Sequence, residues 1–237
     1  MSPGTGFEGR LPCSRWSVWR FNWLPNHKLV RGLVRARRHA HGTLLDVGCG
    51  SRPFAPLFRG HAERYLGLDL PDSPELHVGR PDVFGDAARM PVRGGSVDTI
   101  LSLSMFDLVH EPVRVLVEMR RALAPGGVLI VEFVQTVPVY RGSPDLWRFT
   151  RPGVEQLLKD AGLAAVEILP LGRLPGYVGL AVLGWLNRLN RGRRRILTEL
   201  PVRLLYVLVQ CVAELMDQLW SGSNEIMAHV VVARIGS

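Results

Sequence analysis

Short apolar runs alternate along the chain with segments in which apolar residues recur every three or four positions. The apolar runs are bounded by glycine, proline or polar residues, which is typical of buried strands. They lie at residues 44–47, 65–70, 82–84, 97–103, 128–134, 165–169 and 229–234. Because helical segments separate most of these runs, the pattern predicts an α/β fold with a mostly parallel sheet and helices on both faces.

Proline and glycine mark the expected ends of the helices. A helix is predicted over residues 111–124, where Leu116, Met119 and Leu123 share one face. The Pro-Gly-Gly run at 125–127 is expected to end this helix, because proline and glycine both disfavour its continuation. Further helices are predicted from about Asn26, over 54–58, and from 154 to 161.

Two regions interrupt the alternation. Residues 1–41 form a basic, aromatic-rich arm that runs into a helix. Residues 173–224, which precede the last strand, have the length and spacing of two helices. We therefore divide the chain into an N-terminal segment, 1–41, and a domain, 42–237, with a helical insertion at about 173–224.

Composition narrows the class of protein. The chain has 237 residues, 47% of them hydrophobic, and a net charge of +8, which suits nucleic acid, an anionic membrane or an anionic small molecule equally. Its three cysteines are far apart, so no metal site is expected and a reducing cytoplasm is favoured. The first ten residues lack an apolar signal segment, and the longest apolar run, 174–186, is shorter than the ~20 residues of a bilayer span. A cytoplasmic location is expected, with peripheral membrane contact left open.

The strongest chemical signal is the turn after the first strand. Residues 44–47 read Leu-Leu-Asp-Val and are followed by Gly48-Cys49-Gly50. The two glycines let the backbone turn tightly and approach a ligand closely. The third glycine of the dinucleotide-binding spacing is missing, since Ser-Arg-Pro follows at 51–53. The carboxylate of Asp46 suits a cationic ligand better than a pyrophosphate.

Two further acids follow the turn, one at the end of each of the next two predicted strands. Asp69 ends the next strand, where an acid accepts hydrogen bonds from ribose hydroxyls. Asp86 follows the strand at 82–84, where an acid can accept from the exocyclic amine of adenine. Together with Asp46 they favour a nucleoside that carries positive charge, and S-adenosylmethionine (SAM) carries both an ammonium and a sulfonium.

These ordered motifs resemble the class I, Rossmann-like SAM-dependent methyltransferases, and within them the UbiE-like and Methyltransf_11-like members. The resemblance covers about residues 44–164 and a last strand near 228–234. The matching stretches are LLDVGCGSRP at 44–53, YLGLD at 65–69, GDAARMP at 85–91, GSVD at 95–98 and LAPGGVL at 123–129. The resemblance implies a seven-stranded sheet whose last strand is antiparallel.

The resemblance also implies how SAM is held. The turn at 48–50 would hold the methionine part, Asp69 the ribose, and Asp86 and Ala87 would face the adenine. The end of the fourth strand, 102–104, would line the side of methyl transfer. The implied cofactor-binding residues are Asp46, Gly48, Cys49, Gly50, Asp69, Leu70, Asp86, Ala87, Ser102 and Leu103.

Acceptor chemistry is where the sequence departs from the family. Many members carry Glu-His after the fourth strand, and here those positions are Asp107 and Leu108. Asp107 and His110 are the candidate catalytic bases, which a hydroxyl acceptor would need. The run DLWRFT at 145–150 resembles segments that cover acceptor pockets. The candidate substrate-binding residues are Tyr140, Trp147 and Arg148, with core packing or a structural ion pair as the alternatives.

The insertion favours a small acceptor that is hydrophobic or lipid-like. Between residues 201 and 220, Leu204, Leu208 and Leu215 belong to a broad apolar face with polar residues such as Gln210 opposite. Such a face suits an anionic membrane surface, the cover of an apolar acceptor pocket, or a homodimer interface, and the pattern leaves all three open.

Two other functions compete with methyl transfer to a small molecule. One is a non-catalytic binding or scaffold protein that keeps the SAM fold. The other is an RNA methyltransferase, which the net charge favours. The chain shows no recognisable RNA-binding module, so a nucleic acid partner is disfavoured.

Overall fold

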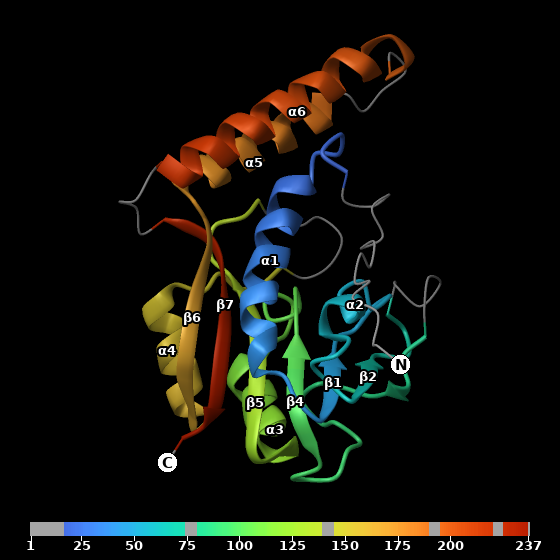
Figure 1. Cartoon of the computed structure of the whole chain (residues 1–237), viewed down its shortest axis with the longest axis vertical. Helices are drawn as coiled ribbons and strands as arrows, with labels where there is room; N and C mark the ends of the chain where they lie inside the picture. Colours follow the sequence, from blue (N-terminus) through green and yellow to red (C-terminus); the bar gives the residue numbers. More distant parts are fainter. Residues whose placement is uncertain (1–16, 74–79, 139–144, 190–194, 220–224, 237) are drawn as a thin grey trace, which may run out of the picture.

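A seven-stranded sheet organises the protein in a computed structural model that describes residues 17–73, 80–138, 145–189, 195–219 and 225–236 (Figure 1). The strand order is β3-β2-β1-β4-β5-β7-β6, and only β7 runs antiparallel to its neighbours. The strands are β1 Thr43–Val47, β2 Arg64–Asp69, β3 Val83–Phe84, β4 Val97–Ser102, β5 Leu123–Val134, β6 Leu163–Arg173 and β7 Ile226–Ile235. The predicted α/β fold, with its mostly parallel sheet and antiparallel last strand, is confirmed.

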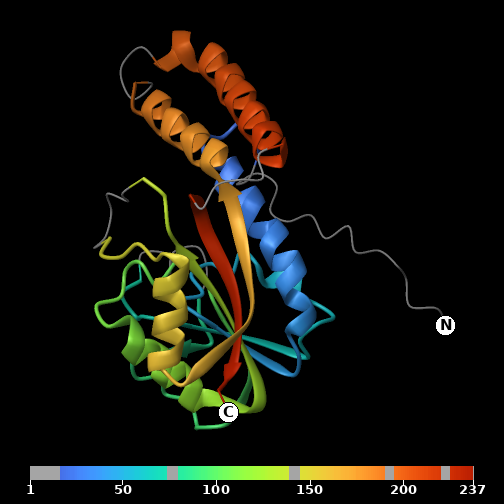
Figure 2. The same cartoon turned by 90° about the vertical axis from the view of Figure 1, so that its left-hand side faces the viewer.

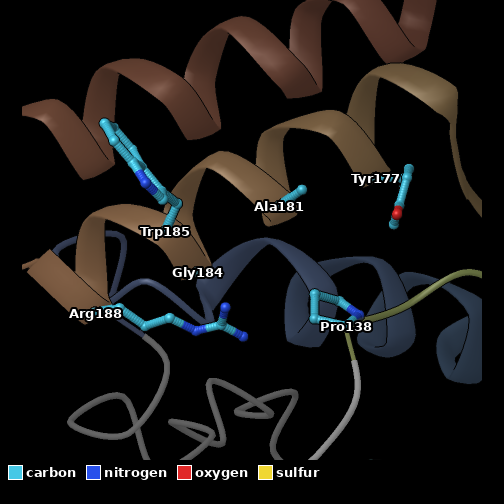
Figure 3. A pocket seen from close by; sticks show the side chains of 6 residues that line it. All are labelled: Pro138, Tyr177, Ala181, Gly184, Trp185 and Arg188. Atoms are coloured by element: carbon cyan, nitrogen blue, oxygen red, sulfur yellow. The ribbon is translucent and has the colours of Figure 1, made fainter.

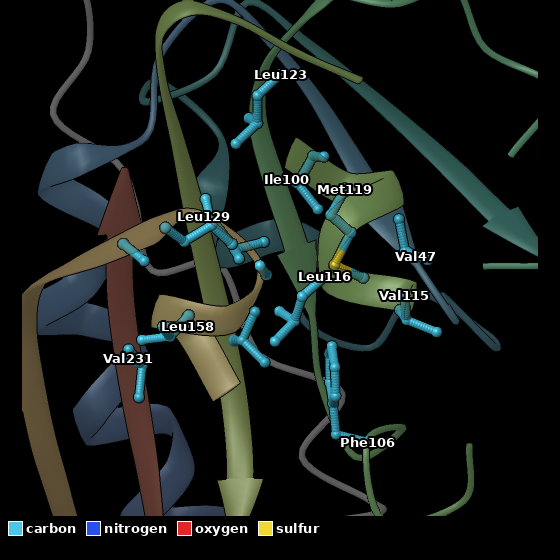
Figure 4. Packing of buried hydrophobic residues seen from close by; sticks show 14 of the residues in the cluster. Val47, Ile100, Phe106, Val115, Leu116, Met119, Leu123, Leu129, Leu158 and Val231 are labelled. Atoms are coloured by element: carbon cyan, nitrogen blue, oxygen red, sulfur yellow. The ribbon is translucent and has the colours of Figure 1, made fainter. Parts of the chain in front are cut away.

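Helices cover both faces of this sheet, as the alternating pattern predicted (Figure 2). The helices are α1 Trp23–Ala36, the 3₁₀ turn η1 Arg37–His39, α2 Ala55–Phe58, α3 Pro112–Ala122, α4 Arg151–Asp160, α5 Leu174–Leu189 and α6 Arg195–Leu219. On one face Leu116 and Met119 of α3 and Leu158 of α4 pack with Ile100 and Leu129 of the sheet (Figure 4). Helices α3 and α4 therefore close one of the two cores.

The second core lies under α1. Leu29, Leu33 and Ala36 share one face of this helix and pack with sheet residues such as Leu44 and Val230. The same helix also contacts α5 and α6. The N-terminal helix is thus part of the main core, and it also supports the helical insertion.

The junction between α3 and β5 differs from the prediction. The helix ends at Ala122, two residues early, and β5 begins at Leu123, five residues before the expected start. The reason is tertiary: Leu123 is buried and pairs with Val97 of β4, and the register shifts between Val97 and Thr99. The Pro-Gly-Gly run therefore lies inside an irregular strand and does not form a separate loop.

The predicted insertion is a helical hairpin of α5 and α6. Since β6 is antiparallel to β7 and β7 is antiparallel to β5, β6 runs parallel to β5. Helix α5 follows β6 directly, so the hairpin begins at the sheet edge where the parallel strands end (Figure 1). Within the described part of the chain, no helix combines the length and the apolar character needed to cross a bilayer.

Candidate cofactor and acceptor site

The carboxyl ends of β1, β2 and β4 bring the predicted cofactor residues together. In the sheet register Val47 of β1 pairs with Leu68 of β2, and Asp46 pairs with Leu101 of β4. The turn after β1, the acid that ends β2 and the end of β4 therefore meet at one edge. This edge of a parallel sheet is where α/β proteins bind ligands.

The turn after β1 needs its glycines. Gly48 and Gly50 have φ of 75° and 48°, in the left-handed region that side chains disfavour. The backbone N–H groups of Gly48 and Cys49 both donate to the carbonyl of Leu68, at 2.9 and 3.1 Å. A Cβ atom at Gly48 would lie 3.0 Å from the sulfur of Met105. The turn is a tightly folded cradle with bare backbone at its bend.

Asp69 fastens this cradle to the second strand. Its Oδ2 accepts from the N–H of Gly50 at 2.7 Å, and its Oδ1 accepts from the N–H of Leu70 at 2.8 Å. Each carboxylate oxygen has a second lone pair, so both can still accept from a ligand hydroxyl. Asp69 is therefore placed to bind a diol while it holds the glycine turn in shape.

Asp46 is buried below the turn and is held by a residue that the sequence reasoning missed. The hydroxyl of Tyr65 donates to Asp46 Oδ2 at 2.5 Å. Burial raises the pKa of Asp46 to about 7, and the Tyr65 hydrogen bond acts in the opposite direction. A nearby cation favours the ionised carboxylate, so the position of Asp46 suits a ligand with positive charge, such as SAM.

The remaining cofactor candidates take different positions. Asp86 is exposed, and its Oδ1 accepts from the N–H of Ala88 at 2.8 Å, which shapes the turn that carries Ala87. The hydroxyl of Ser102 is buried and donates to the carbonyl of Val47 at 3.0 Å, so it ties β4 to β1. The side chain of Leu103 packs in the core under α1. Leu70, directly after Asp69, is exposed.

A buried acid, Glu132 of β5, lies beside the residues that follow β4 and was not predicted. Its Oε2 accepts from both the N–H and the hydroxyl of Ser104, at 3.0 and 2.9 Å. Burial raises the pKa of Glu132 to about 7, and the charge of Asp107 adds to the rise. The signal in the sequence was a single acid inside the apolar run 128–134, which costs free energy and so indicates a specific role.

The comparisons with known proteins agree with this geometry. Residues 45–131 match the family described as a methyltransferase domain. An uncharacterized methyltransferase of Mycobacterium bovis is 36% identical over 99 residues, which cover 38% of this chain and 39% of that protein. The matched part thus spans about two fifths of the curated relative's length. The matched residues include the turn after β1 and the ends of β2 and β4, so this part of the chain is similar to a methyltransferase domain.

Solved structures show the same fold at low sequence identity. The [4+2]-cyclase SpnF has a TM-score of 0.58 at 19% identity, covering 90% of this chain and 82% of that one. A Haemonchus contortus phosphoethanolamine N-methyltransferase, in complex with phosphomonomethylethanolamine and S-adenosylhomocysteine, has a TM-score of 0.55 at 16% identity. That match covers 96% of this chain and 57% of the neighbour. The cofactor of this domain class is SAM, and the glycine cradle with Asp69 and Asp46 fits it.

The fold brings together only some of the residues that were predicted to act on or bind the acceptor. Asp107 is partly buried, burial raises its pKa, and its carbonyl accepts from the N–H groups of Leu146 and Trp147. This contact joins the loop after β4 to the segment 145–150. His110 is exposed near the start of α3. Tyr140 lies outside the described residues.

Trp147 and Arg148 both have structural partners. The indole of Trp147 donates to the carbonyl of Val109 at 2.8 Å, and its ring stacks on Phe149 while 41% of the residue stays exposed. Arg148 forms a two-pronged ion pair with Asp145, at 2.5 and 2.7 Å. The ion pair that the sequence left as an alternative for Arg148 is therefore present, and only Trp147 retains an open face.

The raised pKa of Glu132 predicts a pH-dependent stability. Between about pH 4.5 and 7 the unfolded chain loses the proton of Glu132 first, so the free energy of unfolding falls as the pH rises, by roughly 3 kcal/mol for this group. Glu132→Gln keeps an oxygen acceptor for Ser104 but has no proton to lose. The free energy of unfolding, measured by urea titration, should therefore differ less between pH 5 and pH 8 for this variant than for the unmodified protein. Glu155→Gln, on the exposed surface of α4, is the control and should leave the slope unchanged. Parallel pH profiles for Glu132→Gln and the unmodified protein would contradict the assignment.

Proposed function

We propose that this protein transfers a methyl group from SAM to a small hydrophobic or lipid-like acceptor. The observation that carries the proposal is the cradle of Gly48 and Gly50 fastened by Asp69, above the buried carboxylate of Asp46. When bound, SAM supplies a methyl group already activated by its sulfonium. The residues of the site then have to hold the acceptor in line with that methyl and keep water away.

The roles proposed for the residues follow their positions. Asp69 would accept from the ribose hydroxyls, and Asp86 with Ala87 would face the adenine. The end of β4 leads toward the acceptor side, where Asp107 and His110 are the proposed bases for an acceptor that must lose a proton. Asp107 is partly buried, and burial raises the pKa of its carboxyl, which is the direction that favours a general base.

A pocket beneath α5 supports the proposed acceptor class. It has a volume of about 180 Å³ and is lined by Pro138, Tyr177, Ala181, Gly184, Trp185 and Arg188. In Figure 3, Tyr177 and Arg188 of α5 flank Pro138, which belongs to the segment that follows β5. The lining is apolar apart from the Tyr177 hydroxyl and the Arg188 guanidinium. This combination suits an apolar group that carries an anionic or hydrogen-bonding end.

A transfer experiment with SAM labelled on its methyl group tests the function. The purified protein is incubated with the labelled cofactor and separate lipid, RNA and soluble-metabolite fractions of a cell extract. Label in the lipid fraction is expected. Label in the RNA fraction would show that the acceptor is a nucleic acid and would contradict the proposed acceptor class. Cofactor binding without any labelled product would favour a non-catalytic binding protein.

Filling the pocket should impair acceptor use and spare the cofactor. A Cβ atom built at Gly184 meets no other atom within 4 Å, so Gly184→Leu adds a side chain to the pocket without a backbone clash. We expect kcat/KM for the acceptor to fall about tenfold, because hydrophobic pockets discriminate by roughly that amount per added group, while SAM affinity is unchanged. The control is Val178→Leu, an exposed position of the same helix that does not line the pocket. Equal acceptor kinetics for both variants would remove the pocket from the acceptor site.

A further inference from the structure

Helix α6 is oriented with its polar side toward the protein. Gln210 is fully buried, its Oε1 accepts from the N–H of Leu24 at 3.0 Å, and its Nε2 donates to the carbonyl of Val18 at 2.7 Å. One and two turns further on, Glu214 and Asp217 form ion pairs with Lys28 of α1. The polar stripe of α6 thus attaches this helix to α1 and to the residues just before α1.

The apolar side of the same helix points to solvent. Leu208, Leu215 and Leu219 are 59%, 58% and 72% exposed. They belong to an outer face that we define as Leu200, Leu204, Leu205, Leu208, Val212, Leu215, Met216 and Leu219, all of them exposed. This arrangement is the reverse of the usual one for a surface helix of a globular protein, in which the apolar stripe faces the core and the polar stripe faces water. A contiguous apolar surface of this kind indicates a binding partner.

The orientation decides one of the alternatives that the sequence left open. The outer face of α6 does not cover an acceptor pocket of its own chain, because its side chains point away from the described body. A pocket lined by described residues lies instead under α5. The outer face is therefore free to meet a membrane or another molecule.

The charge around the hairpin favours an anionic partner. The sequence places Arg188, Arg191, Arg193, Arg194 and Arg195 at and between the ends of the two helices, and residues 174–198 contain no acid. The outer face itself contains no charged residue. Trp185 of α5 is 60% exposed, and tryptophan is the side chain that prefers the boundary between lipid and water. An apolar face on a chain with a net charge of +8 matches an anionic lipid surface, whereas a second copy of this basic chain would bring like charges together.

We propose that the outer face of α6 docks on an anionic lipid bilayer. The hairpin begins at the sheet edge that carries the cofactor cradle (Figure 1). Docking through it would hold that edge near the bilayer, from which a lipid-like acceptor could reach the pocket under α5. The docking itself does not rest on the proposed methyl transfer, so vesicle binding and transfer to a dispersed acceptor can fail separately.

Vesicle sedimentation of the full chain tests the docking. Phosphatidylcholine vesicles containing phosphatidylglycerol should bind the protein about tenfold or more tightly than vesicles of phosphatidylcholine alone, and high salt should reduce this preference. Leu208→Glu should weaken binding to the anionic vesicles about tenfold or more, because it places a charge where an apolar side chain enters the lipid. Val117→Glu is the matched control, since Val117 is an exposed apolar residue (45%) of α3, away from the hairpin. It should bind like the unmodified protein.

Three results would overturn the proposal. The first is no sedimentation of the unmodified protein with anionic vesicles. The second is equal binding by the unmodified protein and the folded Leu208→Glu variant. The third is a homodimer in light scattering that Leu208→Glu converts to a monomer while vesicle binding is absent, which would assign the outer face to a second copy of the chain.

Discussion

Replacing Asp69 by alanine is expected to weaken SAM binding about 10- to 100-fold. The carboxylate is the proposed acceptor of the ribose hydroxyls, and hydrogen bonds to a charged acceptor contribute about 1.5–3 kcal/mol. The change also removes the partner of the Gly50 N–H, so the cradle loses its attachment to β2. Isothermal titration calorimetry with SAM measures the loss.

The control for Asp69 lies at the opposite edge of the same sheet. Asp98 Oδ2 accepts from the N–H of Thr43 at 2.8 Å, so Asp98→Ala also removes a carboxylate that binds backbone at a strand end. Asp98 is at the amino end of β4, away from the cradle. Its replacement should cost stability without changing SAM affinity. Equal affinities for the two variants, with both folded by circular dichroism, would move the ribose site elsewhere.

Replacing Lys28 by alanine is expected to destabilise the protein by about 3–5 kcal/mol, the cost of breaking a buried ion pair by removing one partner. The ammonium of Lys28 lies 2.6 Å from Glu214 Oε2 and 2.8 Å from Asp217 Oδ2, and the lysine side chain is only 10% exposed. Without it, two carboxylates under the hairpin lose their shared cation. Asp217 also accepts from the N–H of Gly176, so the start of α5 depends on the same cluster. Urea unfolding measures the change in the free energy of unfolding.

Arg31 provides a stringent comparison, because it binds the same glutamate from outside. Its guanidinium lies 2.9 Å from Glu214 Oε1, but the side chain is 59% exposed. Exposed ion pairs contribute about 0–1 kcal/mol, so Arg31→Ala should be close to the unmodified protein. A similar loss for Lys28→Ala and Arg31→Ala would show that burial of the lysine is not what stabilises the hairpin.

The features that could be predicted from the sequence are those set by local geometry or by order along the chain. The turn at Gly48 and Gly50 was predictable because a positive φ requires glycine in a short stretch of sequence. Asp69 was predictable because a parallel sheet brings successive strand ends to one edge. The fold class was predictable because strands and helices have different periods of apolar residues, and these periods alternate along the chain.

Contacts between distant residues explain what the sequence reasoning missed. The hydroxyl of Tyr65 on β2 donates to Asp46 on β1, and Ser104, which follows β4, donates to Glu132 on β5. Both contacts depend on the register of neighbouring strands. The early start of β5 depends likewise on the pairing of Leu123 with Val97. None of these pairs leaves a periodic signal in the sequence.

Helix α6 separates the two kinds of information most clearly. By itself the sequence determined that this segment has an apolar face and a polar face, because the spacing of its side chains follows from the 3.6-residue repeat of the helix. Only the tertiary structure decided which face is buried. Lys28 and the backbone around Leu24 offer partners to Gln210, Glu214 and Asp217, and these polar groups must find partners when they are buried, whereas the leucines opposite them have no such requirement.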